Sequence, residues 1–362
     1  MTSVAPGQFE HLMIPGPCRL DPDEEAILAA PIAPHYGAAW MTIYARVLDD
    51  LAYLLGADHA YLLPGSGSAG LDAAVFNLFE PGQTVVAVDS GYFGSRLVEM
   101  GRVHGLNVRV VPCVPGLPVD PALVAEQLPG AHGLLVTHVE TSTGVRHPVE
   151  LLAKLAHDAG AVIMVDAISA AGGEHIQMAH MGIDALVSAS QKGLGGAAGL
   201  AVIALSAGGR ERVEARSTPP PTWYLDLTRW DRAAQECHGL EPTPVTVPTT
   251  LIQVLGSSLA RIRAMGVDTW LREYEQLAAD CRDGVRELGL RVAVADEHAA
   301  NMVVVVTDPR ADAVRASLAA NGIMLGGGLR PLEDNTFRIG LVGRSASSEM
   351  VKMVLHEIGQ AL

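Results

Sequence analysis

Short, uniformly apolar runs rich in β-branched residues recur along the first two thirds of the chain. They are "TVVAVD" at 84–89, "NVRVVPC" at 107–113, "GLLVTH" at 133–138, "AVIMVD" at 161–166, "DALVSAS" at 184–190 and "GLAVIALS" at 199–206. Such runs indicate strands that are covered on both faces, as in a largely parallel sheet. Helical patterns lie between them at 68–79, 94–105 and 148–160. This alternation predicts an α/β fold with a mainly parallel, doubly wound sheet.

A Pro-rich segment at 216–227 interrupts this alternation and is followed by a long helical pattern. The later pattern predicts a helix at 267–288, strands near 290–295 and 301–307, a helix at 311–321, a strand at 336–342 and a closing helix at 346–361. We therefore predict an N-terminal arm (1–20), a large domain (21–247), a connecting helix (248–265) and a smaller C-terminal α/β domain (266–362). A chain of 362 residues is long enough for this division.

Composition narrows the classes of protein that the chain can belong to. The formal net charge of −15 argues against a nucleic-acid partner, since phosphate binding needs clustered Lys and Arg. No apolar run reaches the length of a membrane span, and the N-terminal residues lack the pattern of a signal peptide. Four widely spaced cysteines form neither a zinc motif nor a disulfide pattern. We expect a cytoplasmic enzyme without a metal site.

A Gly/Ser loop, "LPGSGSAGLDAAV", precedes the first predicted helix of the sheet. Ser66, Gly67 and Ser68 can offer backbone N–H groups and hydroxyls to a phosphate at a helix N-terminus. The alternative is an ordinary turn with an N-cap. The loop is not a Walker motif, because no Gly-Lys-Ser/Thr follows it.

Asp166 ends the apolar run "AVIMVD" and is the second polar signal at a strand end. It could be a helix cap or a loop anchor. An ionised carboxylate in apolar surroundings also requires a cationic partner, and a protonated pyridine nitrogen is one.

Lys192, in "SASQKGLGG", is the third signal, and it follows the next predicted strand. The chain has three lysines, Lys154, Lys192 and Lys352, among 25 Lys and Arg residues, so 22 are arginines. Lys154 and Lys352 fall in patterns of solvated helix faces. Lys192 could be a surface loop residue, but a lysine at a strand end can also have a lowered pKa and act as a Schiff-base nucleophile.

Together, a phosphate loop, a strand-end Asp and a strand-end Lys match the requirements of pyridoxal 5′-phosphate. At this point the sequence resembles the class V, fold type I aminotransferases, particularly the alanine–glyoxylate and serine–pyruvate branch. The resemblance covers nearly the whole chain and rests on seven segments in the family's order: "LMIPGPCRL", "GSGSAGLDAA", "SGYFGSR", "THVETSTGV", "VDAISAAGG", "SASQKGLGG" and "FRIGLVG".

The resemblance implies a role for each matched residue. Lys192 would be the catalytic Schiff-base lysine and would carry the proton during transamination, and Asp166 would keep the pyridine nitrogen protonated. Phe93, where this branch often has tryptophan, and Ile168 would cover the two ring faces. The remaining residues expected to bind the cofactor, chiefly its phosphate, are Ser66, Gly67, Ser68, Gln191, Ser142 near the cofactor's oxygen side, and Thr246. Thr246 would reach the neighbouring subunit's phosphate, which implies a homodimer with composite sites.

Substrate recognition is the next implication. Arg338 lies between Phe337 and Ile339 on an apolar strand, so it requires an anion; a structural ion pair is the alternative to a bound carboxylate. In the family this position binds the substrate's α-carboxylate, and the main chain around Tyr36 and Gly37 forms the opposite wall of the pocket.

Three residues depart from the pattern or add to it. Val139 replaces the family's usual glycine, and Thr243 lies where an aromatic phosphate contact is common. Arg330 adds a cation near the expected pocket mouth. It is either a solvated loop residue or a contact for a second acid group, a phosphonate or a polar side chain of an unusual donor.

We therefore expect a transaminase that moves an amino group from a small amino acid or amine to glyoxylate or pyruvate by a ping-pong mechanism. The alternative within the fold is a lyase, such as a decarboxylase, a kynureninase-like hydrolase or a desulfurase. The segment 322–337 contains no cysteine, which argues against a desulfurase. A non-catalytic binding protein on this fold is the third possibility.

Overall fold

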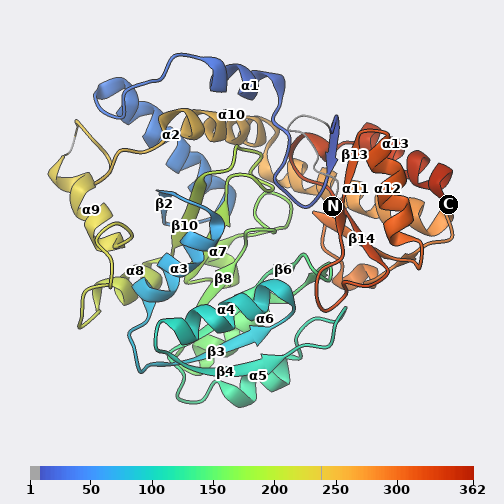
Figure 1. The fold of residues 1–362 in the computed structure, drawn as a ribbon. Helices are drawn as coiled ribbons and strands as arrows, with labels where there is room; N and C mark the ends of the chain where they lie inside the picture. The colour runs from blue at the N-terminus through green and yellow to red at the C-terminus, as the bar shows by residue number, and fades with distance from the viewer. Residues whose placement is uncertain (1–8, 238) are drawn as a thin grey trace.

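A computed structural model describes residues 9–237 and 239–362 of the chain. Its larger sheet has seven strands in the order β2-β10-β9-β8-β5-β3-β4. Figure 1 labels β2, β10, β8, β3 and β4 of this sheet. Their bounds are β2 His59–Pro64, β3 Thr84–Asp89, β4 Asn107–Pro112, β5 Gly133–Thr137, β8 Val162–Asp166, β9 Ala185–Ala189 and β10 Leu200–Leu205. The predicted α/β class and mainly parallel sheet are confirmed.

The six predicted strands of this sheet are all present, but their apolar pattern did not reveal every neighbour or direction. Strand β10 runs antiparallel to both β9 and β2. Strand β2 was not predicted, because its run "HAYLLP" is short and is flanked by polar residues. A strand buried on both faces has the same apolar composition whether it runs parallel or antiparallel to its neighbours. Its direction therefore shows only in the hydrogen bonding between the strands.

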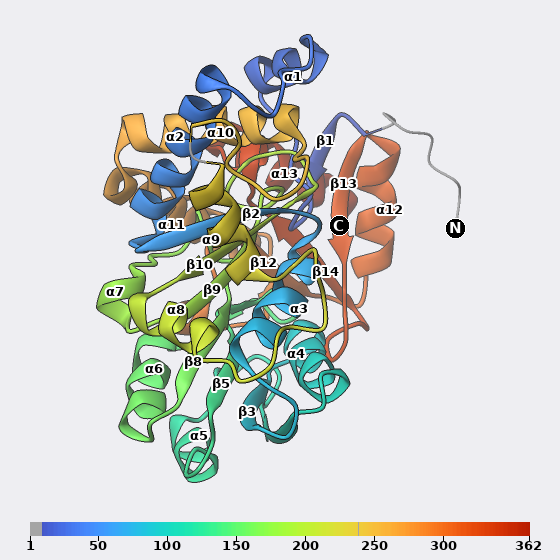
Figure 2. The ribbon, with the colours of Figure 1, turned by 90° about the vertical axis from the view of Figure 1, so that its left-hand side faces the viewer.

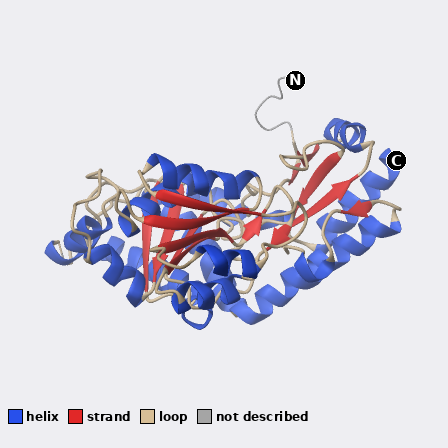
Figure 3. Ribbon diagram, turned by 90° about the horizontal axis from the view of Figure 1, so that it is seen from below, coloured by secondary structure: helices blue, strands red, loops and turns tan. Residues whose placement is uncertain are grey.

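Helices lie on both sides of the larger sheet (Figure 3). Helix α3 packs on β9 and β10, α4 packs on β3, β4 and β5, and α6 packs on β5 and β8. The bounds of the helices up to residue 236 are α1 Pro22–Ala29, α2 Ala38–Leu55, α3 Gly67–Leu78, α4 Tyr92–Val103, α5 Pro121–Gln127, α6 Val149–Asp158, α7 Met178–Met181, α8 Ala207–Glu214 and α9 Leu227–Glu236.

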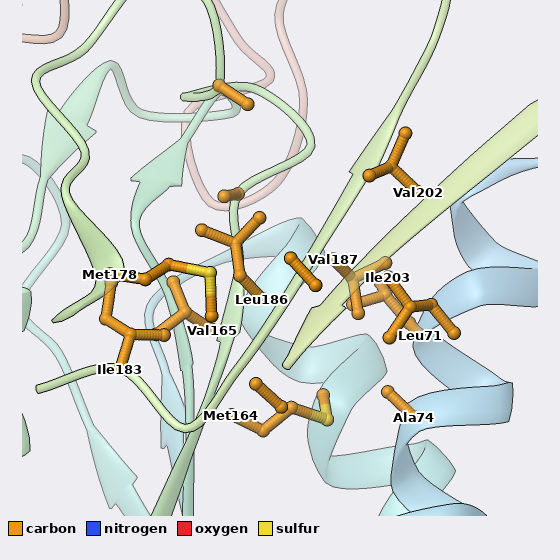
Figure 4. Packing of buried hydrophobic residues seen from close by; sticks show 14 of the residues in the cluster. Leu71, Ala74, Met164, Val165, Met178, Ile183, Leu186, Val187, Val202 and Ile203 are labelled. Carbon is orange, nitrogen blue, oxygen red and sulfur yellow. The ribbon is translucent and has the colours of Figure 1, made fainter. Parts of the chain in front are cut away.

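Tight packing of small side chains brings α3 close to the sheet. A Cβ added to Gly70 would lie 2.9 Å from both Ala201 Cβ and Val187 Cγ1. Figure 4 shows Val187 and Ile203 on the side of Leu71 and Ala74 of α3, and Val165 and Leu186 on the side of Met178 and Ile183. Each fully buried aliphatic side chain here contributes about 2 kcal/mol of transfer free energy. The core thus fixes the strands whose ends carry the polar residues.

A second sheet of five strands has the order β1-β13-β14-β12-β11. Its strands are β1 His11–Met13, β11 Arg291–Val292, β12 Val303–Thr307, β13 Ile323–Gly327 and β14 Thr336–Gly340, and its helices are α11 Val267–Glu287, α12 Ala311–Ala320 and α13 Ser348–Ala361. Strand β1 pairs in parallel with β13, so the N-terminal segment adds a strand to a sheet otherwise made of residues 291–340. Neither β1 nor β13 was predicted. The β6–β7 hairpin (Val139–Glu140 and Val145–Arg146) lies between β5 and β8 in the chain order.

Helix α10 (Thr249–Met265) leads from the larger sheet to α11, in agreement with the predicted connecting helix. It packs along α2 and α1, which Figure 2 shows beside it. The domain boundaries at 20, 247 and 265 stay predictions, and residues 1–8 of the predicted arm lie outside the described residues. Within the described part of the chain, no helix has the length and hydropathy needed to cross a bilayer.

Candidate active site

The carboxyl ends of five strands meet at one edge of the larger sheet. Strands β9, β8, β5 and β3 are mutually parallel, and β2 has the same direction because two antiparallel pairings separate it from β9. A cavity of about 160 Å³ opens there. It is lined by Ser66, Gly67, Ser68, Leu71, Phe93, Arg96, Val139, Asp166, Ile168, Ser169, Gln191 and Lys192. Eight of the ten predicted cofactor-binding residues therefore lie around one cavity.

The Gly/Ser loop forms the N-terminus of α3 at this cavity. Ser66 is the N-cap, and its Oγ accepts a hydrogen bond from the N–H of Ala69 at 3.3 Å. Within the described structure, the N–H groups of Gly67 and Ser68 donate to no acceptor. Gly67 also packs against Ile168, since an added Cβ would lie 2.5 Å from Ile168 Cδ1. Two free N–H groups and the positive end of a 12-residue helix give this wall a preference for an anion.

Asp166, the last residue of β8, lies buried at the floor of the cavity. Its Oδ1 accepts one hydrogen bond, from the N–H of Ile168 at 2.9 Å, and no cation of the described residues forms an ion pair with it. Burial raises the pKa of its carboxyl group to about 7, and the negative charge of Glu140 adds to the effect. A cation placed against Asp166 would stabilise its ionised form.

Lys192 follows β9, and its amine donates a hydrogen bond to the carbonyl oxygen of Pro15. The lysine stem packs on Gly16, where an added Cβ would lie 2.5 Å from Lys192 Cδ. Burial lowers the pKa of Lys192 to about 8, with a further contribution from the cation of Arg338. The amine is still mostly protonated at pH 7, but its neutral, nucleophilic form then makes up about one tenth, far more than in a free lysine.

Ser142 does not line the cavity but is bound to the segment that carries Phe93. Its Oγ donates to Glu140 Oε1 at 2.6 Å and accepts from the N–H of Tyr92 at 3.2 Å. Glu140, which the sequence analysis missed, has no exposed surface and also accepts from the N–H groups of Phe93 and Gly94. The only signal in the sequence is a glutamate in an otherwise uncharged loop.

Arg338 lies on β14, in the second sheet, and its side chain reaches the loop after β5. Its Nε donates to the carbonyl of Gly327 at 2.7 Å, and one terminal nitrogen donates to the carbonyl of Thr141 at 3.2 Å. Burial lowers its pKa to about 10. Since no carboxylate of the described residues pairs with it, the alternative of a structural ion pair is not supported. Its position also couples electrostatically to Lys192.

Tyr36, Gly37 and Thr246 lie together, apart from the residues that line the cavity. The N–H of Gly37 donates to the carbonyl of Leu240 at 2.7 Å, and Thr246 Oγ1 lies 3.5 Å from His35 Nε2. Tyr36 is 54% exposed. A single chain therefore does not bring these three residues to Lys192.

Arg330 and the two departures from the family pattern have distinct positions. Arg330 is exposed and lines a separate cleft of about 530 Å³ together with Arg96. Val139 lines the site cavity itself. Thr243 is buried, and its hydroxyl donates to the carbonyl of Val245 within its own loop.

A larger cavity of about 740 Å³ lies beside α6 and α7 and has five histidines in its wall. It contains neither Lys192 nor Asp166, and its two buried histidines, His138 and His147, have pKa values lowered by burial to about 3 and about 4. These rings are neutral near pH 7. Chemistry, rather than size, therefore identifies the smaller cavity as the candidate active site.

The chain is similar to known aminotransferases over almost its whole length. Residues 30–347 match the family "Aminotransferase class-V". Alanine–glyoxylate aminotransferase of Rattus norvegicus is 31% identical over 363 residues, which cover 97% of this chain and 87% of that protein.

Two solved structures share the fold. Alanine–glyoxylate aminotransferase from Nostoc sp. superposes with a TM-score of 0.92 at 25% identity, covering 100% of this chain and 97% of that one. Ureidoglycine–glyoxylate aminotransferase from Bacillus subtilis gives a TM-score of 0.90 at 26% identity, covering 97% and 92%. The fold is thus the one of these enzymes, fold type I. The protein is an aminotransferase, and the chain belongs to the class V aminotransferase family.

Proposed function

We propose that this enzyme is a pyridoxal-phosphate-dependent transaminase that transfers an amino group from a small amino acid or amine to glyoxylate or pyruvate. The observation that carries the proposal is one cavity in which Lys192, Asp166 and the N-terminus of α3 meet. These groups supply an amine, a buried carboxylate and an anion-binding helix end, which are the three groups that the cofactor requires.

The residues around the cavity fit pyridoxal phosphate. Asp166 is buried without a cationic partner among the described side chains, and the N–H groups of Gly67 and Ser68 are free. Gln191 Oε1 is buried at the same wall and has no donor in the described structure. A protonated pyridine nitrogen would meet the need of Asp166, and a phosphate monoester would accept hydrogen bonds from the two free N–H groups. Gln191 is expected to contribute to the phosphate site by donating through its side-chain nitrogen.

Each residue then has a defined task. When bound, pyridoxal phosphate supplies an electron sink that accepts an amino group and later returns it. Lys192 would move the proton to and from the substrate Cα, and the lowered pKa of its amine supports that role. Asp166 would hold the proton at the pyridine nitrogen, while Phe93 and Ile168 would exclude water from the two ring faces. Arg338 would orient the substrate through its α-carboxylate, which the absence of a carboxylate partner in the described residues supports.

The acceptor class is proposed from relatives. Two of the enzymes compared above are named for alanine and glyoxylate, and one for ureidoglycine and glyoxylate. Glyoxylate and pyruvate are both small 2-oxo acids with one carboxylate, which a single arginine fork can bind in two hydrogen bonds. The lyase alternative gains no support from these relatives.

We also propose that the protein is a cytoplasmic homodimer with composite active sites. Apolar side chains are exposed around the cluster of Tyr36, Gly37 and Thr246: Ile32 is 82% exposed and Leu240 60%. A second copy of the chain would cover them and bring this cluster to the cavity of its neighbour. Four free cysteines support a reducing compartment.

The test is the first half-reaction. The purified enzyme, loaded with pyridoxal phosphate, is mixed with a panel of amines and no acceptor: alanine, serine, aspartate, ureidoglycine, 2-aminoethylphosphonate and pyridoxamine. The donor should remove the visible absorbance of the lysine-bound cofactor in one equivalent, and glyoxylate or pyruvate should restore it. Continuous release of a 2-oxo acid without any acceptor would identify a lyase instead.

Lys192→Ala is the variant that isolates the catalytic residue. It should lose the native absorbance and nearly all turnover, since no other lysine is among the described residues that line the cavity. Lys154→Ala is the matched control, because Lys154 is exposed on α6 and pairs with Asp158. Full turnover and a native spectrum in Lys192→Ala would contradict the proposal.

A further inference from the structure

Glu140 is a fully buried carboxylate that accepts five hydrogen bonds in the candidate active site. Oε2 accepts from Ser90 Oγ at 3.2 Å and from the N–H groups of Phe93 and Gly94 at 3.1 and 2.9 Å. Oε1 accepts from the N–H and the Oγ of Ser142 at 3.1 and 2.6 Å. Both oxygens thus have several donors, three backbone N–H groups and two serine hydroxyls, and the cation of Arg338 interacts with the charge electrostatically without an ion pair among the described residues.

These bonds join two segments that come from different strands. Phe93 and Gly94 belong to the first turn of α4, after β3, and Ser142 lies in the turn of the β6–β7 hairpin, which follows β5. The helix has no side-chain cap of its own, because its N-cap is Gly91. Glu140, at the end of β6, therefore caps α4 from another element and binds N–H groups that would otherwise lack acceptors.

The glycines of "SGYFG" make room for this arrangement. A Cβ on Gly91, whose φ is +148°, would lie 2.7 Å from Ser142 Oγ and 3.0 Å from Glu140 Cδ. A Cβ on Gly94 would lie 2.5 Å from Ser90 Oγ. The two segments are thus as close as the backbone allows, and the carboxylate occupies the space between them.

We propose that Glu140 is a positioning residue that fixes the ring-covering Phe93 at the cofactor site by bonding the first turn of α4 and Ser142 to one buried carboxylate. This inference rests on the proposed use of pyridoxal phosphate. Glu140 itself does not line the cavity and so acts through its partners. Its negative charge also raises the pKa of Asp166, whereas the cations of Lys192 and Arg96 lower it, and the cation of Arg338 interacts with Glu140.

Glu140→Gln tests the proposal, because glutamine keeps the shape but has one acceptor oxygen and one amino group. The amino group must replace either Oε1, which accepts from Ser142, or Oε2, which accepts from Ser90, Phe93 and Gly94. At least two of the five bonds are therefore lost, and each backbone N–H on that side loses its acceptor. Glu174→Gln is the matched control. Glu174 is also buried and well bonded, but its partners are Arg146 and Asn301, and none of these three residues lines the site cavity.

The first arm needs no cofactor. In the apoprotein, hydrogen exchange of the peptide amides that face the new amino group, either that of Ser142 or those of Phe93 and Gly94, should become about tenfold faster in Glu140→Gln than in the wild type. Exchange at all three amides should not change in Glu174→Gln. The second arm titrates the apoproteins with pyridoxal phosphate. The Kd should rise about tenfold or more in Glu140→Gln and stay within about twofold in Glu174→Gln.

The third arm measures how the negative charge of Glu140 affects the titration of the bound cofactor. The pH midpoint of the visible absorbance change of the bound cofactor should move to lower pH in Glu140→Gln alone, because a negative charge beside Asp166 is gone. If Glu140→Gln does not fold, Ser90→Ala removes one of the five bonds and should weaken cofactor binding by about threefold.

Unchanged exchange, Kd and pH midpoint in a folded Glu140→Gln protein, or an unchanged Kd in Ser90→Ala, would overturn the inference. Failure of the wild-type protein to bind pyridoxal phosphate would instead refute the proposed function, and the exchange arm would still report on the positioning of α4.

Discussion

Lys192 and Asp166 lie at the ends of two neighbouring strands, and burial shifts the pKa of each toward neutrality from opposite sides. The amine of Lys192 has a pKa of about 8 and the carboxyl of Asp166 one of about 7. Burying a lysine, and an aspartate that has no cationic partner among the described residues, lowers the free energy of unfolding of the cofactor-free protein. Their cost is offset when a ligand with an aldehyde and a protonated ring nitrogen is bound.

Asp166→Asn should therefore stabilise the cofactor-free protein. The folded-state pKa of Asp166 is raised above its unfolded value of 3.8, so the folded state holds the proton more tightly. Asp166 therefore costs the folded protein no stability below about pH 4, where it is protonated in both states. As pH rises toward about 7 the free energy of unfolding falls, and at pH 8 the ionisable Asp166 has lowered it by a few kcal/mol. The thermal midpoint of apo Asp166→Asn should exceed that of the apo wild type at pH 8, with the difference vanishing near pH 4. A lower midpoint than the wild type at pH 8 would show that Asp166 is already paired.

The sequence was sufficient to predict the residues whose chemistry is rare in their setting. A lysine in a chain with three lysines, and an aspartate that ends an apolar run, are visible without a structure. Glu140 was not predictable in this way, because its role depends on donors that lie 46 to 50 positions earlier in the chain. Contacts of that kind arise only from the order of β3 and β5 in the sheet.

At the scale of elements, the N-terminal segment is part of the candidate site. Strand β1 pairs with β13, and the residues after it cross β14 so closely that a Cβ on Gly340 would lie 1.9 Å from the carbonyl carbon of Ile14. Pro15, which accepts the hydrogen bond of Lys192, follows directly. Apolar runs predicted strands such as β3 and β8 well, but the three-residue β1 has no periodicity long enough to recognise.

Gly340→Ala tests this contact. The new methyl group must displace the backbone of Ile14 and Pro15, and we expect a loss of about 1–3 kcal/mol in the free energy of unfolding. The hydrogen bond between Lys192 and Pro15 should weaken at the same time, which a changed rate of pyridoxal phosphate capture by the apoprotein would report. Gly208→Ala is the control, since its added Cβ would meet its nearest neighbour at 3.4 Å. Wild-type stability in Gly340→Ala would contradict the described course of the N-terminal segment.

At the scale of the whole molecule, one chain supplies an incomplete set of the predicted site residues. Eight of the ten predicted cofactor-binding residues line the cavity, whereas Thr246 lies beside Tyr36 and Gly37 at an exposed apolar surface. Sequence reasoning predicted both groups through family resemblance. The pattern of one chain could not locate Thr246 in space, because its expected neighbour belongs to another copy.

Subunit complementation tests the composite site. Lys192→Ala lacks the amine, and Thr246→Asp would place a negative charge against the phosphate, so each variant alone should be nearly inactive. In a refolded equal mixture, half of the dimers are mixed, and each contains one intact site if Lys192 and Thr246 serve different subunits. About one quarter of the wild-type activity should return. Absence of any regain, with mixed dimers shown by native mass spectrometry, would mean that both residues serve the same site or that the dimer is not composite.

The most direct measurement of the central claim uses the small number of lysines in this chain. The protein is incubated with pyridoxal phosphate, reduced with borohydride and digested, and each lysine-containing peptide is weighed. The account predicts one pyridoxyl phosphate on the peptide of Lys192 and none on those of Lys154 and Lys352, which are exposed residues of α6 and α13. An unlabelled Lys192 peptide, or equal labelling of all three lysines, would contradict it.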